Sequence, residues 1–241
     1  MTARAKLRVV SSSDAAEEPL EWLTSFSEFT DEDWARHDAA LREERQQKAK
    51  KELAERQAEC MGLWPSWGLP RRCRENLRGG IKRTKAVDAM ASFDAEIDGA
   101  GTVTLVVLSG HTGCGKTTAA SAWLTERLSD RESKTSRRLI HASELAELER
   151  FDRGEMSSIR KARRLVIDDL STEYLDPKGC LLSMVDALLN ARYADMLPTV
   201  MTTNLNAKAF EARYGERIWD RIREAGRFIE LDDKSLRGHQ R

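Results

Sequence analysis

One short segment limits this chain to a narrow set of folds. Residues 110–117 read GHTGCGKT and match the pattern G-x-x-x-x-G-K-[ST]. The preceding residues 104–108 form a continuous β-rich, mostly apolar run, as in a strand that is buried on both faces of a sheet. Residues 116–128 are rich in helix formers and contain no glycine or proline. Strand, glycine-rich turn and helix in this order predict a phosphate-binding loop at the edge of a sheet.

Each part of this phosphate loop (residues 110–117) has a physical role in binding a nucleoside triphosphate. Gly113 and Gly115 let the backbone curl so that its N–H groups point at phosphate, and the helix N-terminus adds positive potential. Lys116 reaches the β and γ phosphates, and the Thr117 hydroxyl can ligate Mg²⁺. The sequence therefore predicts ATP and Mg²⁺ as ligands. The predicted nucleotide contacts are Gly110, His111, Thr112, Gly113, Cys114, Gly115, Lys116, Thr117 and Thr118.

A second acidic motif follows the apolar run Leu165–Ile167. Hydrolysis of ATP needs a carboxylate for the metal and a group that orients water. We expect Asp168 to hold Mg²⁺ and Asp169 to polarise the attacking water. Glu173 is a reserve candidate for the second role, because Asp169 is shorter than the glutamate often found there.

Asn204 ends a predicted strand that we place beside the strand of Asp168. A side-chain amide at that point can hydrogen-bond the γ-phosphate or the lytic water. The alternative is an ordinary Asx turn before Leu205. Because the phosphate loop and the acidic motif accompany it, we favour the catalytic interpretation.

Composition excludes several classes of protein. A chain of 241 residues can form one sizeable α/β domain with a smaller appendage. Lys+Arg and Asp+Glu both number 40, so only local charge clusters can indicate a partner. No signal-peptide pattern opens the chain, and no apolar stretch is long enough to cross a bilayer. The scattered cysteines and histidines favour neither a disulfide framework nor a metal site. We expect a cytoplasmic protein with reduced thiols.

The part before the phosphate loop divides into three segments. Residues 1–20 are mostly small, polar and charged, which predicts a disordered tail. Residues 21–62 predict a helical extension, with a possible capping box at 30–33 that opens a long charged helix. Sparse apolar positions favour a solvated connecting helix over a weak coiled coil. An apolar cluster precedes it and suits either a small packed helix or a partner-docking motif: Trp22, Leu23, Phe26 and Phe29.

Glycines and prolines between residues 62 and 70 mark a boundary, and a basic segment follows. Residues 71–85 contain seven basic residues and one acid. Such a segment can follow a nucleic-acid backbone, touch nucleotide phosphates or simply be a solvated surface. Residues 160–164 form a second, smaller basic patch. The candidate DNA-binding residues are Arg71, Arg72, Arg74, Arg78, Lys82, Arg83 and Lys85.

The remainder alternates between strand and helix patterns. The predicted strands are 138–141, 164–169, 198–204 and 227–231, and the predicted helices are 143–148, 180–196 and 207–225. Strands separated by helical crossovers imply a parallel sheet in a three-layer α/β/α domain. The expected fold class is therefore α/β, a P-loop NTPase domain over residues 63–241 preceded by a helical N-terminal extension.

Five segments together resemble the DnaC/IstB group of AAA+ ATPases, which contains helicase loaders and ATP-dependent helpers of transposases. They are GLPRR at 68–72, LVIDDLSTE at 165–173, TVMTTNL at 199–205, YGERIWDRI at 214–222 and SLR at 235–237. The resemblance covers about residues 65–238 and implies an AAA+ core. The first part of the chain resembles neither the N-terminal domain of the transposition helpers nor the cysteine-rich zinc module of some helicase loaders.

The resemblance also implies roles for arginines. Arg221 matches the arginine finger, which completes the active site of a neighbouring subunit and stabilises charge on the γ-phosphoryl group. Arg217 and Arg223 are close enough in the sequence to be alternatives. Arg237 matches the sensor-two arginine, which contacts phosphate within its own subunit. An ATP-dependent homo-oligomer is therefore expected.

The function that this resemblance favours is an ATP-dependent helicase loader that acts on a replicative helicase and single-stranded DNA. The alternative is a transposition helper that assembles on duplex DNA with a transposase. A small-molecule kinase is disfavoured, because no lid-like arginine cluster or acceptor-binding motif is present. A binding-only switch stays open, because Asp169 stands where glutamate is common.

Overall fold

The computed structural model describes residues 30–99, 103–126, 136–170, 180–232 and 235. It contains two units, Met1–Glu55 and Arg56–Arg241. The expected disordered tail, the apolar cluster at 22–29, Glu173 and Arg237 lie outside the described residues.

Helix α2, Asp31–Leu63, begins at the predicted capping box. The Thr30 N–H donates to Asp33 Oδ2 at 2.9 Å, and the Asp33 N–H donates to Thr30 Oγ1 at 3.3 Å. Trp34 is 41% exposed and Leu53 is 54% exposed, which agrees with a solvated helix. No helix of the described residues is apolar over the length that crossing a membrane requires.

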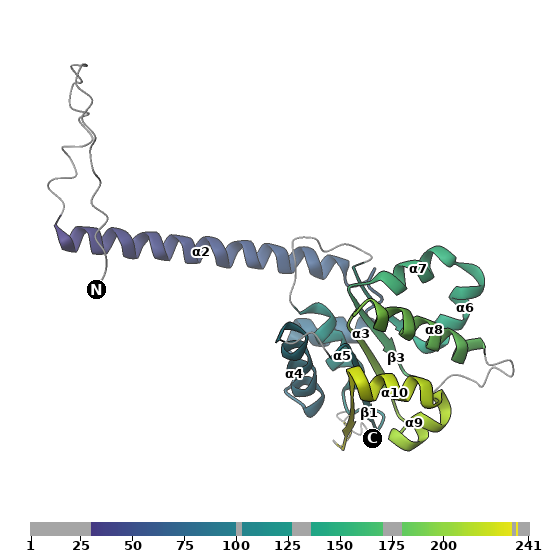
Figure 1. Cartoon of the computed structure of the whole chain (residues 1–241). Helices are drawn as coiled ribbons and strands as arrows, with labels where there is room; N and C mark the ends of the chain where they lie inside the picture. The colour runs from purple at the N-terminus through teal and green to yellow at the C-terminus, as the bar shows by residue number, and fades with distance from the viewer. Residues whose placement is uncertain (1–29, 100–102, 127–135, 171–179, 233–234, 236–241) are drawn as a thin grey trace, which may run out of the picture. The chain divides into compact units, whose positions relative to one another are not determined.

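Five parallel strands form one sheet in the order β2-β3-β4-β1-β5 (Figure 1). The strands are β1 (Leu105–Gly110), β2 (Arg137–His141), β3 (Arg164–Asp168), β4 (Thr199–Thr203) and β5 (Gly226–Leu231). All five lie where the sequence predicted them. The inner strands β1, β3 and β4 are buried almost throughout, whereas β5 at the edge of the sheet is partly exposed. After β1 the chain crosses to β2 at the far edge of the sheet, and β3 and β4 then lie between β2 and β1. Strands β3, β4 and β1 are therefore neighbours.

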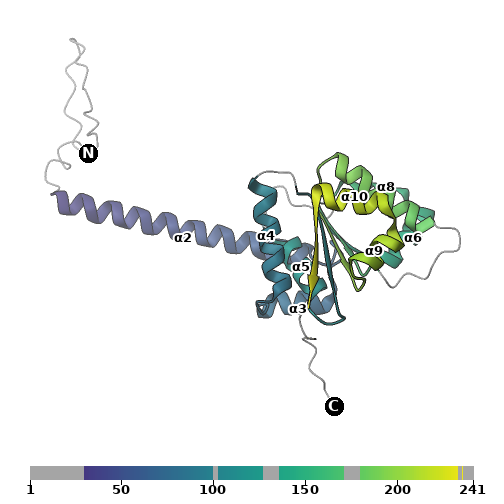
Figure 2. The same ribbon diagram turned by 60° about the horizontal axis from the view of Figure 1, so that its bottom comes forward.

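Helices cover both faces of this sheet, as a three-layer domain requires. Val106 and Leu108 belong to one apolar cluster, whereas Leu105 and Val107 belong to another, as the alternation of side chains along a strand dictates. Figure 2 shows α4 and α5 on one side of the strands and α8, α9 and α10 on the other. The helices of the first side are α3 (Arg71–Gly79), α4 (Lys85–Gly99) and α5 (Lys116–Thr125). Those of the second are α6 (Ala142–Phe151), α7 (Arg153–Lys161), α8 (Cys180–Ala194), α9 (Ala207–Tyr214) and α10 (Glu216–Ala225).

The helices differ from the sequence prediction in two ways. Residues 207–225 form two helices rather than one, because Gly215 separates them at a φ of 85°. Helices α3, α4 and α7 were not predicted. Helix α3 was missed because four of its nine residues are arginines. Its sequence therefore indicates a charge cluster and not a helix with an apolar face.

The segment before α3 is bonded to the edge strand β2. The Leu139 N–H donates to the Trp67 carbonyl at 2.6 Å, and the Arg138 guanidinium donates to the Ser66 carbonyl. Gly68 follows at a φ of 82°, where an added Cβ would lie 2.1 Å from the Leu139 carbonyl oxygen. Only glycine suits this close approach. The contact covers the sheet edge and fixes the point from which α3 starts.

Candidate functional site

Three neighbouring strand ends bring the candidate residues together. Strand β4 pairs with both β1 and β3, so the carboxyl ends of these strands meet at one edge of the sheet. The phosphate loop follows β1, Asp169 follows β3 and Asn204 follows β4. Ligands of parallel α/β sheets bind at this edge. The prediction that the strand of Asn204 lies beside that of Asp168 is confirmed.

The phosphate loop has a backbone that its glycines make possible. Gly113 and Gly115 lie at φ values of 91° and 93°, in the left-handed region. Gly110 lies at a φ of 155°, and an added Cβ would lie 2.7 Å from the Leu231 carbonyl oxygen. Gly115 begins α5 without a side-chain cap, so the first N–H groups of α5 are available to an anion.

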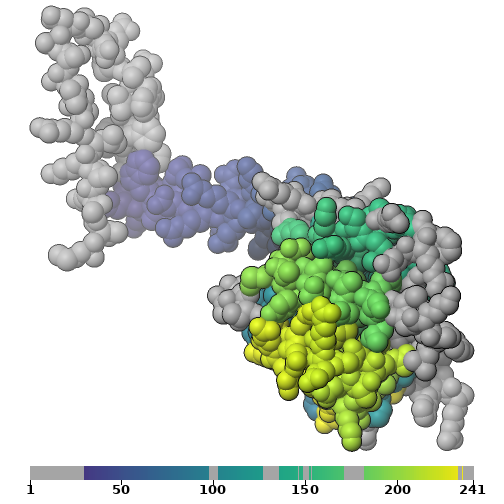
Figure 3. Space-filling view, turned by 45° about the vertical axis from the view of Figure 1, so that its right-hand side comes forward, coloured from purple at the N-terminus to yellow at the C-terminus, as the bar shows by residue number. Residues whose placement is uncertain are grey.

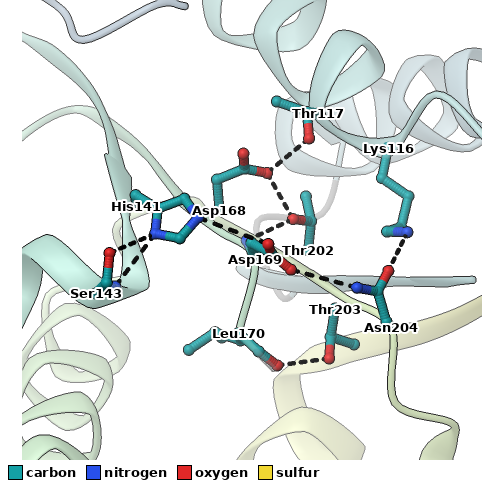
Figure 4. Close-up of polar contacts among 10 residues, drawn as sticks. All are labelled: Lys116, Thr117, His141, Ser143, Asp168, Asp169, Leu170, Thr202, Thr203 and Asn204. Carbon is teal, nitrogen blue, oxygen red and sulfur yellow. Dashed lines mark hydrogen bonds and ion pairs between the residues drawn. The ribbon is translucent and has the colours of Figure 1, made fainter. Parts of the chain in front are cut away.

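Lys116 is buried at the centre of the site, with an exposure of 8%. Its ammonium group donates to the Gly110 carbonyl at 2.6 Å and to the His111 carbonyl at 3.0 Å. It also donates to Asn204 Oδ1 at 2.9 Å (Figure 4). A buried ammonium is costly unless its donors are satisfied, and these three oxygens satisfy them. Lys116 thereby links the phosphate loop to the end of β4.

Asp168 connects β3 to strand β4 and to the first turn of helix α5. Its Oδ1 accepts hydrogen bonds from Thr117 Oγ1 at 2.9 Å and from Thr202 Oγ1 at 2.6 Å. Thr202 Oγ1 also accepts from the Asp169 N–H at 2.9 Å. Sequence reasoning did not identify Thr202. The signal available was its place on β4, one strand away from Asp168 and in register with it.

Asp169 has an unusual backbone and two polar neighbours. Its φ is 62°, a left-handed conformation that aspartate tolerates better than most residues. Its Oδ1 lies 3.4 Å from Asn204 Nδ2, and its Oδ2 lies 3.6 Å from His141 Nε2. The other ring nitrogen of His141 lies 2.7 Å from Ser143 Oγ (Figure 4). The sequence analysis took His141 as isolated, although it ends β2 opposite Asp168.

A cavity of about 710 Å³ lies over these groups, a size within the usual range for small-molecule sites. One side is formed by the phosphate loop and the strand ends. The other side comes from α3, the α3–α4 connection and the start of α4. The lining residues of that second side are Arg72, Cys73, Asn76, Gly80, Ile81, Lys82, Thr84 and Val87. The sequence analysis left nucleotide phosphates open as a target of the basic segment and named Arg72 and Lys82 as DNA-binding candidates.

The predicted contacts do not all line the cavity. Thr112, Gly113, Gly115, Lys116, Thr117 and Thr118 line it together with Asp168, Asp169 and Asn204. Gly110 and His111 do not line it, but their carbonyls accept hydrogen bonds from Lys116. The thiol of Cys73 also lines the cavity, and burial raises its pKa, so it is protonated at neutral pH.

The predicted arginine finger contacts its own chain. Arg221 donates to Asp186 Oδ1 at 2.7 Å and to Asn190 Oδ1 at 2.6 Å, and its side chain is 12% exposed. Arg217 pairs with the same Asp186 at 3.3 Å but is 70% exposed. Arg223 pairs with Asp220 at 2.5 Å. These arginines lie on α10, whose surface continues that of α8 in Figure 3 (yellow and light green).

Comparison with known proteins places this fold. No protein-family model matches the sequence, and no curated protein matches it. The structure of the DnaC helicase loader is similar at 20% identity and a TM-score of 0.54, covering 67% of this chain and 99% of that one. AMPPCP-bound DnaA from Aquifex aeolicus is similar at 19% identity and a TM-score of 0.50, covering 67% of this chain and 51% of that one. The replication initiator DnaA bound to AMPPCP and single-stranded DNA is similar at 18% identity and a TM-score of 0.50, covering 69% of this chain and 51% of that one.

These similarities establish the fold. The chain has the same fold as the DnaC helicase loader. A parallel sheet lies between helical layers, and helix α2 precedes it in the sequence. The fold class and the DnaC-like resemblance expected from the sequence are thereby confirmed.

Proposed function

We propose that this chain binds ATP in the 710 Å³ cavity and hydrolyses it. The observation that carries the proposal is the convergence of the phosphate loop, two acids and an amide on this one cavity at the carboxyl edge of the sheet. A buried lysine at a glycine-rich helix N-terminus suits a polyphosphate. An acid and an amide opposite it suit a water molecule that attacks the terminal phosphate.

The residues present suit Mg²⁺ as the metal. Among the described residues, no group of three or more His, Cys, Asp and Glu side chains could hold a metal ion by itself. Thr117 Oγ1 and Asp168 Oδ1 lie 2.9 Å apart and are hard oxygen ligands. Mg²⁺ typically takes one or two such protein ligands and completes its shell with substrate phosphates and water. Bound there, it would neutralise charge between the β and γ phosphates.

The protein groups divide the chemical work between them. The N–H groups of the phosphate loop and the Lys116 ammonium hold the phosphates, with phosphate oxygens replacing the carbonyls that Lys116 now contacts. Asp169 orients the attacking water and accepts its proton. Asn204 contacts both Lys116 and Asp169. Its amide therefore positions the attacking water relative to the γ-phosphate. Arg221 is the proposed trans-acting finger, and Glu173 and Arg237 keep their proposed roles outside the described residues.

We propose further that this ATPase acts in an oligomer as a helicase loader in DNA replication. Two similar folds support this role, one named a helicase loader and one bound to single-stranded DNA. Residues 21–62 are the proposed docking extension for a replicative helicase, before an ATPase domain at 63–241. The basic residues of 71–85 that do not line the cavity, with Arg160 and Lys161, are the proposed DNA contacts.

A co-purification tests this role. Tagged Asp169→Asn protein with ATP would be recovered from native host extract, and bound proteins would be identified by mass spectrometry. Lys116→Ala serves as the control that cannot hold ATP. Recovery of a replicative helicase with the first variant, lost in the control and on deletion of residues 1–60, supports the loader. Recovery of a transposase on duplex DNA instead would replace it with the transposition helper.

A further inference from the structure

The basic segment 71–85 separates into two sets of side chains. Outside the cavity, Arg71 pairs with Glu75 at 2.9 Å and Arg83 pairs with Asp88 at 2.7 Å. Further residues of this set also have partners, since Lys85 pairs with Asp232 and the Arg78 guanidinium lies 5.9 Å from the Trp64 ring. Their charges are therefore partly used within the protein.

Arg72 and Lys82 belong to the other set. Both line the cavity, and in the described part of the chain no hydrogen bond or ion pair engages either side chain. Arg72 is next to Arg71 in the sequence, and Lys82 is next to Arg83, and both of these neighbours have ion-pair partners. The two sets therefore differ in where their side chains lie and not in local composition. Two unpaired cations over a cavity with two carboxylates indicate an anionic ligand.

The position of Arg72 brings it to the phosphate side of the cavity. It lies in the first turn of α3, before Cys73, whose buried thiol contacts Thr118 and Ser121 of α5. Thr118 directly follows the phosphate loop, so this turn of α3 lies over the start of α5. Lys82 lies next to Ile81 on the connection between α3 and α4, and it lines the same cavity as the phosphate loop.

The charge balance of the cavity depends on these two residues. Its lining contains Asp168 and Asp169 as anions and Lys116 as the buried cation. Without Arg72 and Lys82, the carboxylates would outnumber the cations, and the lining would repel a polyanion. With them, cations outnumber carboxylates.

We propose that Arg72 and Lys82 bind the polyphosphate of the nucleotide, so that this part of the basic segment serves the nucleotide site and not the DNA surface. The inference rests on the proposed function, because it names further ligands at the same site. Both side chains are exposed and line the same cavity as the phosphate loop, so both can reach a polyphosphate that is bound there.

The test is nucleotide affinity in matched pairs of variants. Isothermal titration with ATP and Mg²⁺ would compare Arg72→Gln with Arg71→Gln, and Lys82→Gln with Arg83→Gln, at low and high salt. We expect Arg72→Gln and Lys82→Gln each to weaken ATP binding by about tenfold, as loss of one charge-assisted bond does. Arg71→Gln and Arg83→Gln should stay within about twofold of the wild type, because Glu75 and Asp88 already neutralise these side chains. Thermal melting of each variant shows that it is folded.

The outcomes separate this inference from the proposed function. If the wild type binds ATP, Lys116→Ala abolishes binding, and Arg72→Gln and Lys82→Gln both bind like the wild type, the inference fails alone. Equal losses in all four glutamine variants would also overturn it, since a general surface potential would then explain them. If the wild type binds no nucleoside triphosphate, both the inference and the proposed function are wrong.

Discussion

Asn204 accepts a hydrogen bond from the Lys116 ammonium at 2.9 Å, and this bond joins the end of β4 to the phosphate loop. The amide nitrogen of the same side chain points the other way, 3.4 Å from Asp169 Oδ1. One amide therefore contacts both Lys116, the cation proposed to bind the γ-phosphate, and Asp169, the acid proposed to orient the attacking water. A change in either neighbour reaches the other through Asn204.

Asn204→Ala is expected to lower ATP turnover by about a hundredfold, the cost of removing one positioned hydrogen-bond donor. ATP affinity should change by only about threefold, because Lys116 and the N–H groups of the phosphate loop still hold the phosphates. Steady-state turnover and ATP titration measure the two effects. An equal loss in both would mean that Asn204 acts in nucleotide binding and not in catalysis.

Asp169→Asn is expected to slow hydrolysis by about a thousandfold, within the range of a lost general base, while ATP stays bound. Asparagine tolerates the left-handed backbone at this position as aspartate does, so the fold should not change. Single-turnover hydrolysis and filter retention of labelled ATP provide the readout. Unchanged hydrolysis would remove Asp169 from the mechanism and leave Glu173 as the candidate.

The sequence predicted the strands and the strand-end residues because these depend on local signals. Asp168 and Asn204 end apolar runs, and a parallel sheet brings the carboxyl ends of adjacent runs together. Thr202 was missed because its role depends on register, which places it beside Asp168 across two strands. His141 was missed for the same reason, since it pairs with Asp168 from β2.

The basic segment could not be divided from the sequence alone. Arg71 and Arg72 are neighbours of the same type, and only the helix determines that one reaches Glu75 while the other faces the cavity. Lys85 finds its partner Asp232 far along the chain. Net charge over a segment therefore indicated a polyanion without identifying which one.

We expect substitution of the buried Arg192 to cause a large loss of stability. It is fully buried, and its guanidinium donates to Thr199 Oγ1 and to carbonyls at the end of α7 and the start of β4. Burial lowers its pKa to about 9, so it is still charged at neutral pH. Arg192→Met leaves those carbonyls unpaired and should lower the free energy of unfolding by about 3–5 kcal/mol. Chemical denaturation measures this, with Lys208→Met on the exposed face of α9 as a control expected within about 0.5 kcal/mol. A loss below about 1 kcal/mol would contradict it.

Arg221 and Arg217 differ in what their loss should do. Arg221 is tied to Asp186 and Asn190, so as a trans-acting finger it must exchange these partners for a phosphate of the next subunit. We expect Arg221→Ala to lower turnover by about a thousandfold at protein concentrations where subunits assemble. It should also lower the melting temperature, because Asp186 then loses a partly buried partner.

Arg217→Ala is the matched comparison, since its exposed side chain shares Asp186 but contributes little to stability. It should leave both the melting temperature and the concentration-dependent turnover close to those of the wild type. Turnover measured across a range of protein concentrations distinguishes the two arginines. If Arg217→Ala alone loses the concentration dependence, Arg217 is the finger, and the bonds of Arg221 serve to hold α10 against α8. If neither variant loses it, neither arginine is the finger, and Arg223 is the remaining alternative on α10.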